Sequence, residues 1–293
     1  MERVLRDRTA AVIFLGPALV IYVCILLIPI GWSIGYTFFS GSPISGFTFA
    51  GFQNYTTLVQ DRRFWDAFWF STRYAIFVTG GQIGLGLALA LFYHFYLKRS
   101  SALIRTLVFF PVVLPTVAVA AIFQKLFAIA PQYGVVNAVF DLIGLHSLVQ
   151  PWLGRGQTAF WVLVIMDVWR AMGFYAVILY AGLIEIPAET IEAARLDGAS
   201  GWALAQLVIL PLLMPITISA LIFSLNGTLK VFDSVVALTG GGPGNATTPL
   251  TLYMYRAAFT NNAYGYGSTI AVMLTLYCLI VSLLAYRFAR RDV

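Results

Sequence analysis

Charged side chains inside apolar stretches are the residues of this sequence whose spacing points most directly to chemistry. Asp167 and Arg170 stand three residues apart in one apolar stretch, and Lys230 and Asp233 repeat that spacing in another. Residues three apart share one face of a helix, so each pair can neutralise its own charges. Charges within a membrane are costly and indicate function, but a self-neutralised pair can also serve only to fix how helices pack. Both interpretations remain open on the sequence alone.

Two serine motifs match enzyme signatures but lack the required context. Residues 31–35 (GWSIG) match G-x-S-x-G, whose nucleophilic serine needs a strand, a turn and a helix, whereas these residues end an apolar helix. Residues 198–201 (GASG) match the G-x-S-G of intramembrane serine proteases but fall in a predicted loop, away from a histidine. We predict no catalytic residue. The two histidines and two cysteines are isolated from one another, so we also predict no metal site and no disulfide: His94, His146, Cys24 and Cys278.

The composition places the chain in a membrane. Of the 293 residues 60% are hydrophobic and 10% are charged, and the mean hydropathy is +0.86. Soluble domains carry about 25% charged residues, so this chain has too few to cover a water-exposed surface. The net charge is +6, but the basic residues are dispersed rather than clustered, which argues against binding to nucleic acid.

Six apolar stretches are long enough to cross a bilayer, for which about 20 residues suffice. The sequence therefore predicts an all-α integral membrane protein with a single transmembrane domain, residues 1–293. The predicted spans are residues 10–39, 68–96, 107–128, 159–183, 212–238 and 268–289.

The distribution of basic residues predicts that both termini are cytoplasmic, because cytoplasmic loops carry the excess of Lys and Arg. Four basic residues then lie in outer loops: Arg62, Arg63, Arg155 and Arg256. Ten lie inside: Arg3, Arg6, Arg8, Lys98, Arg99, Arg105, Arg195, Arg287, Arg290 and Arg291.

The inner loop between the fourth and fifth spans has the clearest local pattern, EIPAETIEAARLDGASGWALAQLVILPLLMP at residues 185–215. Pro187 suits the first turn of a helix, which is expected to run to about Leu196 and to stop at Asp197-Gly198. A second helix is expected from near Ser200 to Pro211. This helix-turn-helix would leave apolar side chains exposed unless a partner covers them: Trp202, Leu204, Leu207 and the Ala193-Ala194 pair.

The same loop resembles the EAA loop of ABC importer permeases. The resemblance rests on Glu192-Ala193-Ala194, on Gly198 after three residues, and on Val208-Ile209-Leu210-Pro211 after nine more. Four other segments are similar to the carbohydrate-uptake branch of that family: Gly51-Phe52-Gln53-Asn54-Tyr55, Asp167-Val168-Trp169, Leu229-Lys230-Val231-Phe232-Asp233 and Leu238-Thr239-Gly240-Gly241-Gly242-Pro243-Gly244.

The resemblance implies that this cytoplasmic helix docks onto a separate ATPase and transmits its movement. The residues implied in coupling are Glu192, Ala193, Ala194, Asp197, Gly198 and Pro211. The chain contains no Gly-Lys dipeptide and hence no Walker A loop. No cofactor is therefore expected in this chain, and ATP and Mg²⁺ are expected on the partner ATPase.

A sugar path is the second implication. Sugar hydroxyls need hydrogen-bond partners and sugar rings stack on aromatic side chains, so polar residues of the fourth and fifth spans are candidates to line the path. These are Asp167, Arg170, Tyr175, Ser224, Thr228 and Lys230.

The family implies an assembly in the bacterial or archaeal inner membrane. Expected partners are a second homologous permease, two ATPase subunits or domains, an extracytoplasmic solute-binding protein, a sugar and the lipid bilayer. Two alternatives remain: a secondary transporter that needs no ATPase, and an intramembrane hydrolase that uses Ser33 or Ser200.

Overall fold

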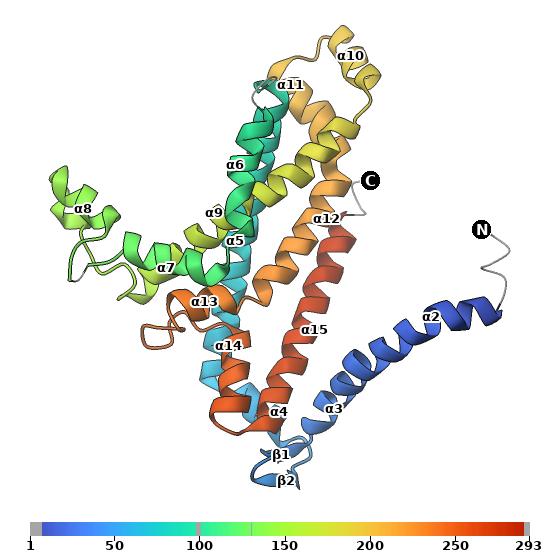
Figure 1. Cartoon of the computed structure of the whole chain (residues 1–293), viewed down its shortest axis with the longest axis vertical. Helices are drawn as coiled ribbons and strands as arrows, with labels where there is room; N and C mark the ends of the chain where they lie inside the picture. Colours follow the sequence, from blue (N-terminus) through green and yellow to red (C-terminus); the bar gives the residue numbers. More distant parts are fainter. Residues whose placement is uncertain (1–7, 98–100, 130, 290–293) are drawn as a thin grey trace. The chain divides into compact units, whose positions relative to one another are not determined.

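The computed structural model describes residues 8–97, 101–129 and 131–289, and these are mostly helical (Figure 1). The chain separates into two compact units. One comprises Met1–Phe64 with Tyr253–Leu276, and the other Trp65–Leu252 with Tyr277–Val293. Six of the basic residues predicted to be cytoplasmic lie outside the described residues: Arg3, Arg6, Lys98, Arg99, Arg290 and Arg291.

The first unit begins with a long apolar helix and a hairpin. Its elements are α2 (Arg8–Tyr22), a π-helical stretch (Val23–Leu27), α3 (Ile28–Tyr36), β1 (Phe39–Ser42), β2 (Gly46–Phe49) and α4 (Gln53–Gln60). None of the helical side chains in Val12–Tyr36 is buried within the structure. The predicted first span reached residue 39, but the helix ends at Tyr36, where the Thr37 N–H bonds to the Ile34 carbonyl and the chain turns into β1.

Asn54 and Gly265 fix the position of the hairpin, although they lie far apart in the sequence. β1 and β2 are antiparallel, with Phe39 opposite Phe49. The amide of Asn54, in the motif after the first span, donates to the carbonyls of Thr37 (2.8 Å) and Phe39 (2.9 Å). A Cβ at Gly265 would lie 1.7 Å from the Phe39 carbonyl oxygen, so only glycine allows this approach.

A carboxylate held by two tyrosines joins α4 to the later part of the same unit. Tyr253 and Tyr266 both donate to Oδ2 of Asp61, and the backbone N–H of Arg63 donates to Oδ1 (2.9 Å). Burial raises the pKa of Asp61, but these hydrogen bonds together lower it by more. The pKa of Asp61 therefore lies below its usual value. Burial and the bond to Asp61 raise the pKa of Tyr253 to about 12.

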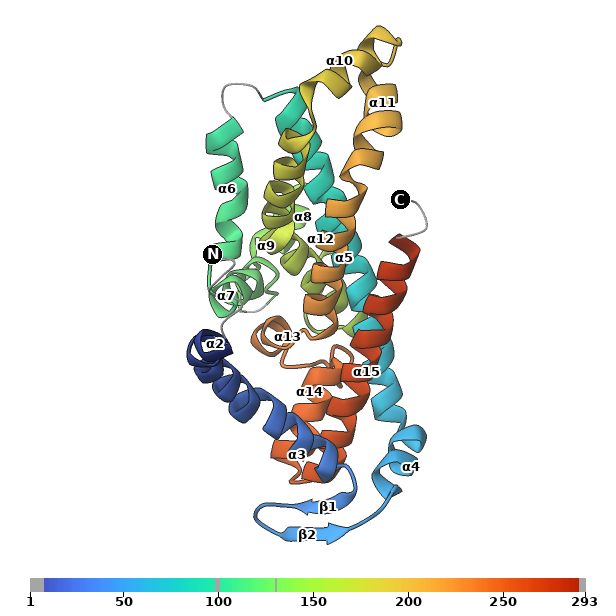
Figure 2. The same cartoon turned by 90° about the vertical axis from the view of Figure 1, so that its right-hand side faces the viewer.

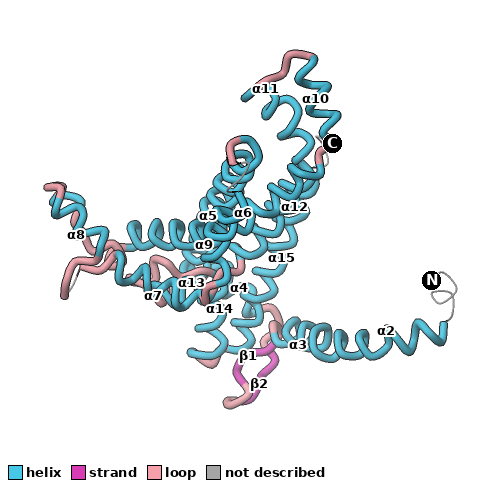
Figure 3. The backbone as a smooth tube through the Cα atoms, turned by 45° about the horizontal axis from the view of Figure 1, so that its top comes forward, coloured by secondary structure: helices cyan, strands magenta, loops and turns pink. Residues whose placement is uncertain are grey.

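The remaining elements are helices joined by short loops, with no strand beyond the hairpin in the part of the chain that is described (Figure 3). They are α5 (Arg62–Phe95), α6 (Ser101–Val113), α7 (Thr116–Leu126), α8 (Val135–Leu142), a 3₁₀ turn (His146–Leu148), α9 (Gly156–Glu185), α10 (Ala188–Leu196), α11 (Gly201–Leu204), a π-helical stretch (Ala205–Ile209), α12 (Leu210–Leu229), α13 (Asp233–Leu238), α14 (Leu250–Tyr255), a second such stretch (Arg256–Thr260) and α15 (Tyr264–Ala289).

Helix α9 is the centre of the second unit and lies between α6 and α12 (Figure 2). Glycine permits the closest of these contacts, because a Cβ at Gly173 would lie 2.1 Å from the Val108 carbonyl oxygen of α6. The main core joins α5, α7, α9 and α13 and contains Tyr74, Phe123, Met166 and Val235. A large apolar core of this kind fixes the positions of the polar side chains that enter it.

The predicted third span, residues 107–128, is a bent pair of helices. α6 ends at Val113 and α7 starts at Thr116, and the two are bent by 96° (Figure 1). Pro115 causes the break, because its ring disfavours helical geometry at Leu114 and it has no N–H to donate. The described residues thus contain five long apolar helices, or six spans if this bent pair counts as one.

The predicted fifth span, residues 212–238, is interrupted near its C-terminal end. Its helix is continuous from Gly201 to Leu229, and a break of three residues, Lys230 to Phe232, then separates α12 from α13. The hydroxyl of Thr251 donates to the Val231 carbonyl that the break frees. Lys230 and Asp233 therefore do not share a helical face.

Candidate functional site: a polar cavity and an exposed helix-turn-helix

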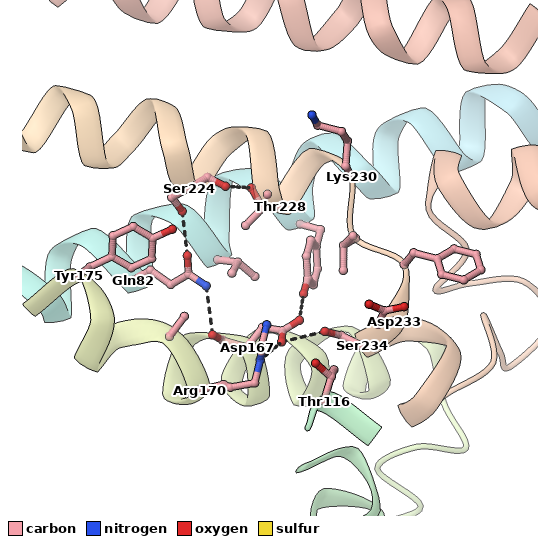
Figure 4. A pocket seen from close by; sticks show the side chains of 16 residues that line it. Gln82, Thr116, Asp167, Arg170, Tyr175, Ser224, Thr228, Lys230, Asp233 and Ser234 are labelled. Carbon is pink, nitrogen blue, oxygen red and sulfur yellow. Dashed lines mark hydrogen bonds and ion pairs between the residues drawn. The ribbon is translucent and has the colours of Figure 1, made fainter. Parts of the chain in front are cut away.

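A polar cavity of about 240 Å³ lies within the second unit, where α5, α9 and the broken α12–α13 segment meet (Figure 4). The break matters here, because it ends α12 beside the cavity and starts α13 at Asp233. Its lining includes Tyr74, Gln82, Thr116, Asp167, Arg170, Tyr175, Ser224, Thr228, Lys230, Asp233 and Ser234.

Asp167 is the most constrained group in this cavity, since its side chain is buried and receives donors from three helices. Oδ2 accepts from the phenol of Tyr74 on α5. Oδ1 accepts from the hydroxyl of Ser234 on α13 (2.9 Å) and from Nε of Arg170 on α9 (3.3 Å). The ion pair with Arg170 confirms the pairing that the i, i+3 spacing predicts. A buried carboxylate needs such partners to remain charged.

A second set of hydrogen bonds ties α5 to α12. The Ser224 hydroxyl contacts the Gln82 amide oxygen (2.8 Å) and the Thr79 hydroxyl (3.0 Å), and Thr79 also contacts Thr228 (3.1 Å). Gln82 in turn donates to the backbone carbonyl of Asp167 (3.1 Å). The wall of the cavity is therefore one connected polar network, which holds α5 against both α9 and α12.

All six residues predicted for the sugar path line this one cavity, although their surroundings differ. Ser224 and Thr228 are buried with their hydroxyls engaged in the network, and Tyr175 is buried beside them. Lys230 is exposed, and Figure 4 shows its ammonium group directed away from Asp167. Within the described residues, Lys230 and Asp233 form no ion pair, which corrects the second predicted pair.

Sequence reasoning missed the residues that α5 contributes, and it missed Ser234. Thr79 and Gln82 are polar residues three apart inside a long apolar helix, a signal that could have found them. Tyr74 and Ser234 carry no such signal, because only the tertiary fold brings them to Asp167.

The helix-turn-helix segment is the second candidate site. α10 spans Ala188–Leu196, and Gly198, with φ +90°, turns the chain towards α11. The Gly198 N–H bonds to the Arg195 carbonyl (3.1 Å), and glycine accepts this left-handed geometry without strain. Pro211 lies inside the continuous helix from Gly201 to Leu229, just after the π-helical stretch Ala205–Ile209. The loop therefore has a defined shape.

One surface of this segment has apolar side chains that nothing in the described chain covers. Leu196 is 89% exposed, and Trp202 and Leu207 are each 71% exposed. Leu204, predicted to be exposed, is instead buried in a small core with Leu183 and Leu213. That core fixes the base of the segment while its outer surface stays open to a partner.

Apolar spans around a polar cavity, with exposed apolar side chains on the helix-turn-helix, are features expected of a membrane transport protein. Residues 82–291 match the family described as the inner membrane component of binding-protein-dependent transport systems, and the chain belongs to this family. It is a transmembrane subunit of an ABC importer in the cell membrane.

Two curated relatives illustrate the family. The chain is 33% identical over 288 residues to the sulfoquinovosyl glycerol transport system permease protein of Agrobacterium fabrum, covering 98% of this chain and 92% of the relative. It is 36% identical over 247 residues to the trehalose/maltose transport system permease protein of Thermococcus litoralis, covering 83% of this chain and 81% of the relative.

A solved structure has the same fold. A chain of a bacterial ABC transporter involved in the import of the acidic polysaccharide alginate superposes with a TM-score of 0.82 at 22% identity, over 99% of this chain and 98% of that one. The alternatives of a secondary transporter and an intramembrane hydrolase receive no support from these comparisons.

Proposed function

We propose that the chain is one of two homologous permease subunits of an importer for a sugar or a sugar-like solute, and that the solute passes the cavity between α5, α9, α12 and α13. The observation that carries this proposal is the connected polar network around Asp167 within an otherwise apolar helix bundle. A polyhydroxylated solute needs many hydrogen-bond partners, and the polar side chains that line this cavity can supply them. The substrates in the names of the two relatives are of this class.

The second part of the proposal concerns the partners. An extracytoplasmic solute-binding protein delivers the solute, as the family description implies, and two ATPase subunits or domains bind ATP and Mg²⁺. This chain supplies no catalytic residue. It supplies the path, whose opening alternates between the outer and the inner side of the membrane.

Coupling is assigned to the helix-turn-helix. We propose that Leu196, Trp202 and Leu207 contact the ATPase, and that Glu192 pairs with a basic residue there. Ala193 and Ala194 allow close approach, and Asp197 and Gly198 shape the turn. Pro211 lies in the helix that carries the movement to the cavity. The buried Leu204 gives the segment a rigid base.

The complex reconstituted with its ATPase and binding protein tests the function. We expect one or more of maltose, trehalose, sulfoquinovosyl glycerol and an alginate oligosaccharide to stimulate ATP hydrolysis severalfold in the presence of the binding protein. Stimulation by amino acids or by metal ions, with none by any carbohydrate, would contradict the proposed solute class while leaving the family assignment intact.

A further inference from the structure

We infer that Asp167 is a positioning residue, and that Arg170 is the group through which α9 contacts the transported solute. The inference rests on the proposed function, because it assigns roles within the proposed path. It gives different roles to two residues that the sequence offers as equal candidates for the path.

The carboxylate of Asp167 is buried, and most of its hydrogen-bonding capacity is already used by protein donors. Only 4% of the residue is exposed, and its two oxygens accept three hydrogen bonds, from Tyr74, Ser234 and Arg170. An ionised carboxylate has about four acceptor positions, so three of them are already occupied. Burial keeps a solute from the position that remains. The donors of Tyr74 and Ser234 come from α5 and α13, so losing either of them would also remove a link between helices.

Arg170, unlike Asp167, is partly exposed and has donor groups that no described residue uses. Its side chain is 25% exposed and lines the cavity, and only its Nε is engaged, by Asp167. Within the described residues, its two terminal guanidinium nitrogens donate to no protein atom. They offer four N–H groups in a planar arrangement, which suits the oxygen acceptors of sugar hydroxyls and of sugar carboxylates. Asp167 fixes the plane of that guanidinium by holding Nε.

Asp233 provides a matched control, because it is an acidic residue of the same cavity with different surroundings. It is exposed, and no hydrogen bond or ion pair engages its carboxylate in the described part of the chain. Replacing it by asparagine removes the same charge from the same cavity without touching the guanidinium of Arg170.

A double-mutant cycle on the complete reconstituted complex tests the assignment. Uptake of labelled trehalose, maltose and an alginate trisaccharide is measured for Asp167→Asn, Arg170→Gln and the double variant. We expect each single change to raise the half-saturating concentration about tenfold, because a charged hydrogen bond is lost or misdirected. The double variant should be no worse than Arg170→Gln alone.

A multiplicative effect of the two substitutions would contradict the inference. If the two changes multiply to about a hundredfold, Asp167 contacts the solute independently and the inference is wrong. Asp233→Asn should have the same effect with and without Arg170→Gln, which excludes a general effect of cavity charge.

A second measurement needs no transported solute and so separates this inference from the proposed function. In a background with Cys24→Ser and Cys278→Ser, Arg170→Cys should react with a water-soluble methanethiosulfonate reagent, and Asp167→Cys should react at least about tenfold more slowly because it is buried. Equal rates would overturn the inference. If none of the three sugars is transported but the rates differ as expected, the solute class is wrong and the assignment of the two residues stands.

Discussion

At the scale of single residues, hydrogen bonding decides what each charge does. Asp61 and Asp167 are both carboxylates held by tyrosine hydroxyls, yet one braces a loop region and the other stands inside the helix bundle. Lys230 and Asp233 share the spacing of Asp167 and Arg170, but a break in the helix separates them. Spacing therefore predicts a pair only where the helix is continuous.

The lowered pKa of Asp61 predicts that the folded protein loses stability at acid pH. Its pKa is lower in the folded protein than its ordinary value of 3.8, so its stabilising contribution is complete above that value and disappears as the pH falls through the folded pKa. Thermal unfolding of the subunit in detergent between pH 3 and pH 7 measures this. The unfolding midpoint of Asp61→Asn should lie several degrees below that of the unchanged protein at pH 6, and the gap should narrow towards pH 3.

Asp66→Asn is the control for this measurement, because Asp66 is an exposed carboxylate close to Asp61 in the chain, on α5. It should shift the midpoint little at any pH. A gap between Asp61→Asn and the unchanged protein that stays constant down to pH 3 would show that the charge of Asp61 does not contribute.

At the scale of elements, the spans were predictable and their breaks were predictable only in part. Hydropathy located α5, α9 and α15, because a span must be apolar over its whole length. The bend between α6 and α7 has a local cause in Pro115. The break after Leu229 contains neither proline nor glycine. It is stabilised instead by the hydroxyl of Thr251, which donates to the freed Val231 carbonyl. Contacts of that kind cannot be read from one segment of sequence.

The cavity, too, was predictable only where its residues carry a local signal. The residues contributed by α9 and α12 were predicted from their polarity within apolar segments. Tyr74 and Ser234 were not, because they reach Asp167 through the packing of α5 and α13. What sequence lacked was the arrangement of helices around the carboxylate.

Helix packing supplies a prediction at this scale. A methyl group at Gly173 would overlap the Val108 carbonyl of α6, so Gly173→Ala should destabilise the protein by about 1–3 kcal/mol. The midpoint of thermal unfolding in detergent should fall by several degrees. Gly80→Ala is the control, since no atom lies within 4 Å of its added Cβ. Equal midpoints for the two variants would show that α6 and α9 do not pack as described.

At the scale of the whole molecule, the proposed function divides the work of an importer subunit between the two candidate sites. In that proposal the polar cavity is the place for the solute, and the exposed helix-turn-helix is the surface for a partner. α12 connects them physically, because one continuous helix runs from Gly201 beside the turn to Leu229 beside the cavity. A movement imposed on the turn therefore reaches the cavity without crossing a loop.

The central claim is that the shape of this turn couples a separate ATPase to transport, and Gly198→Pro tests it directly. Proline fixes φ near −65° and has no N–H, so it removes both the left-handed turn and the bond to Arg195. Gly144→Pro is a matched control, since Gly144 also has a positive φ (+77°), open surroundings and an N–H bond three residues back, to Asp141.

The measurement is ATP-driven uptake by the reconstituted complex, with both variants compared at equal amounts of membrane-inserted protein. We predict that Gly198→Pro reduces uptake to about a tenth or less of the unchanged complex, which corresponds to a loss of coupling of about 1.4 kcal/mol or more, while Gly144→Pro retains most of it. Uptake by Gly198→Pro equal to that of Gly144→Pro would contradict the account.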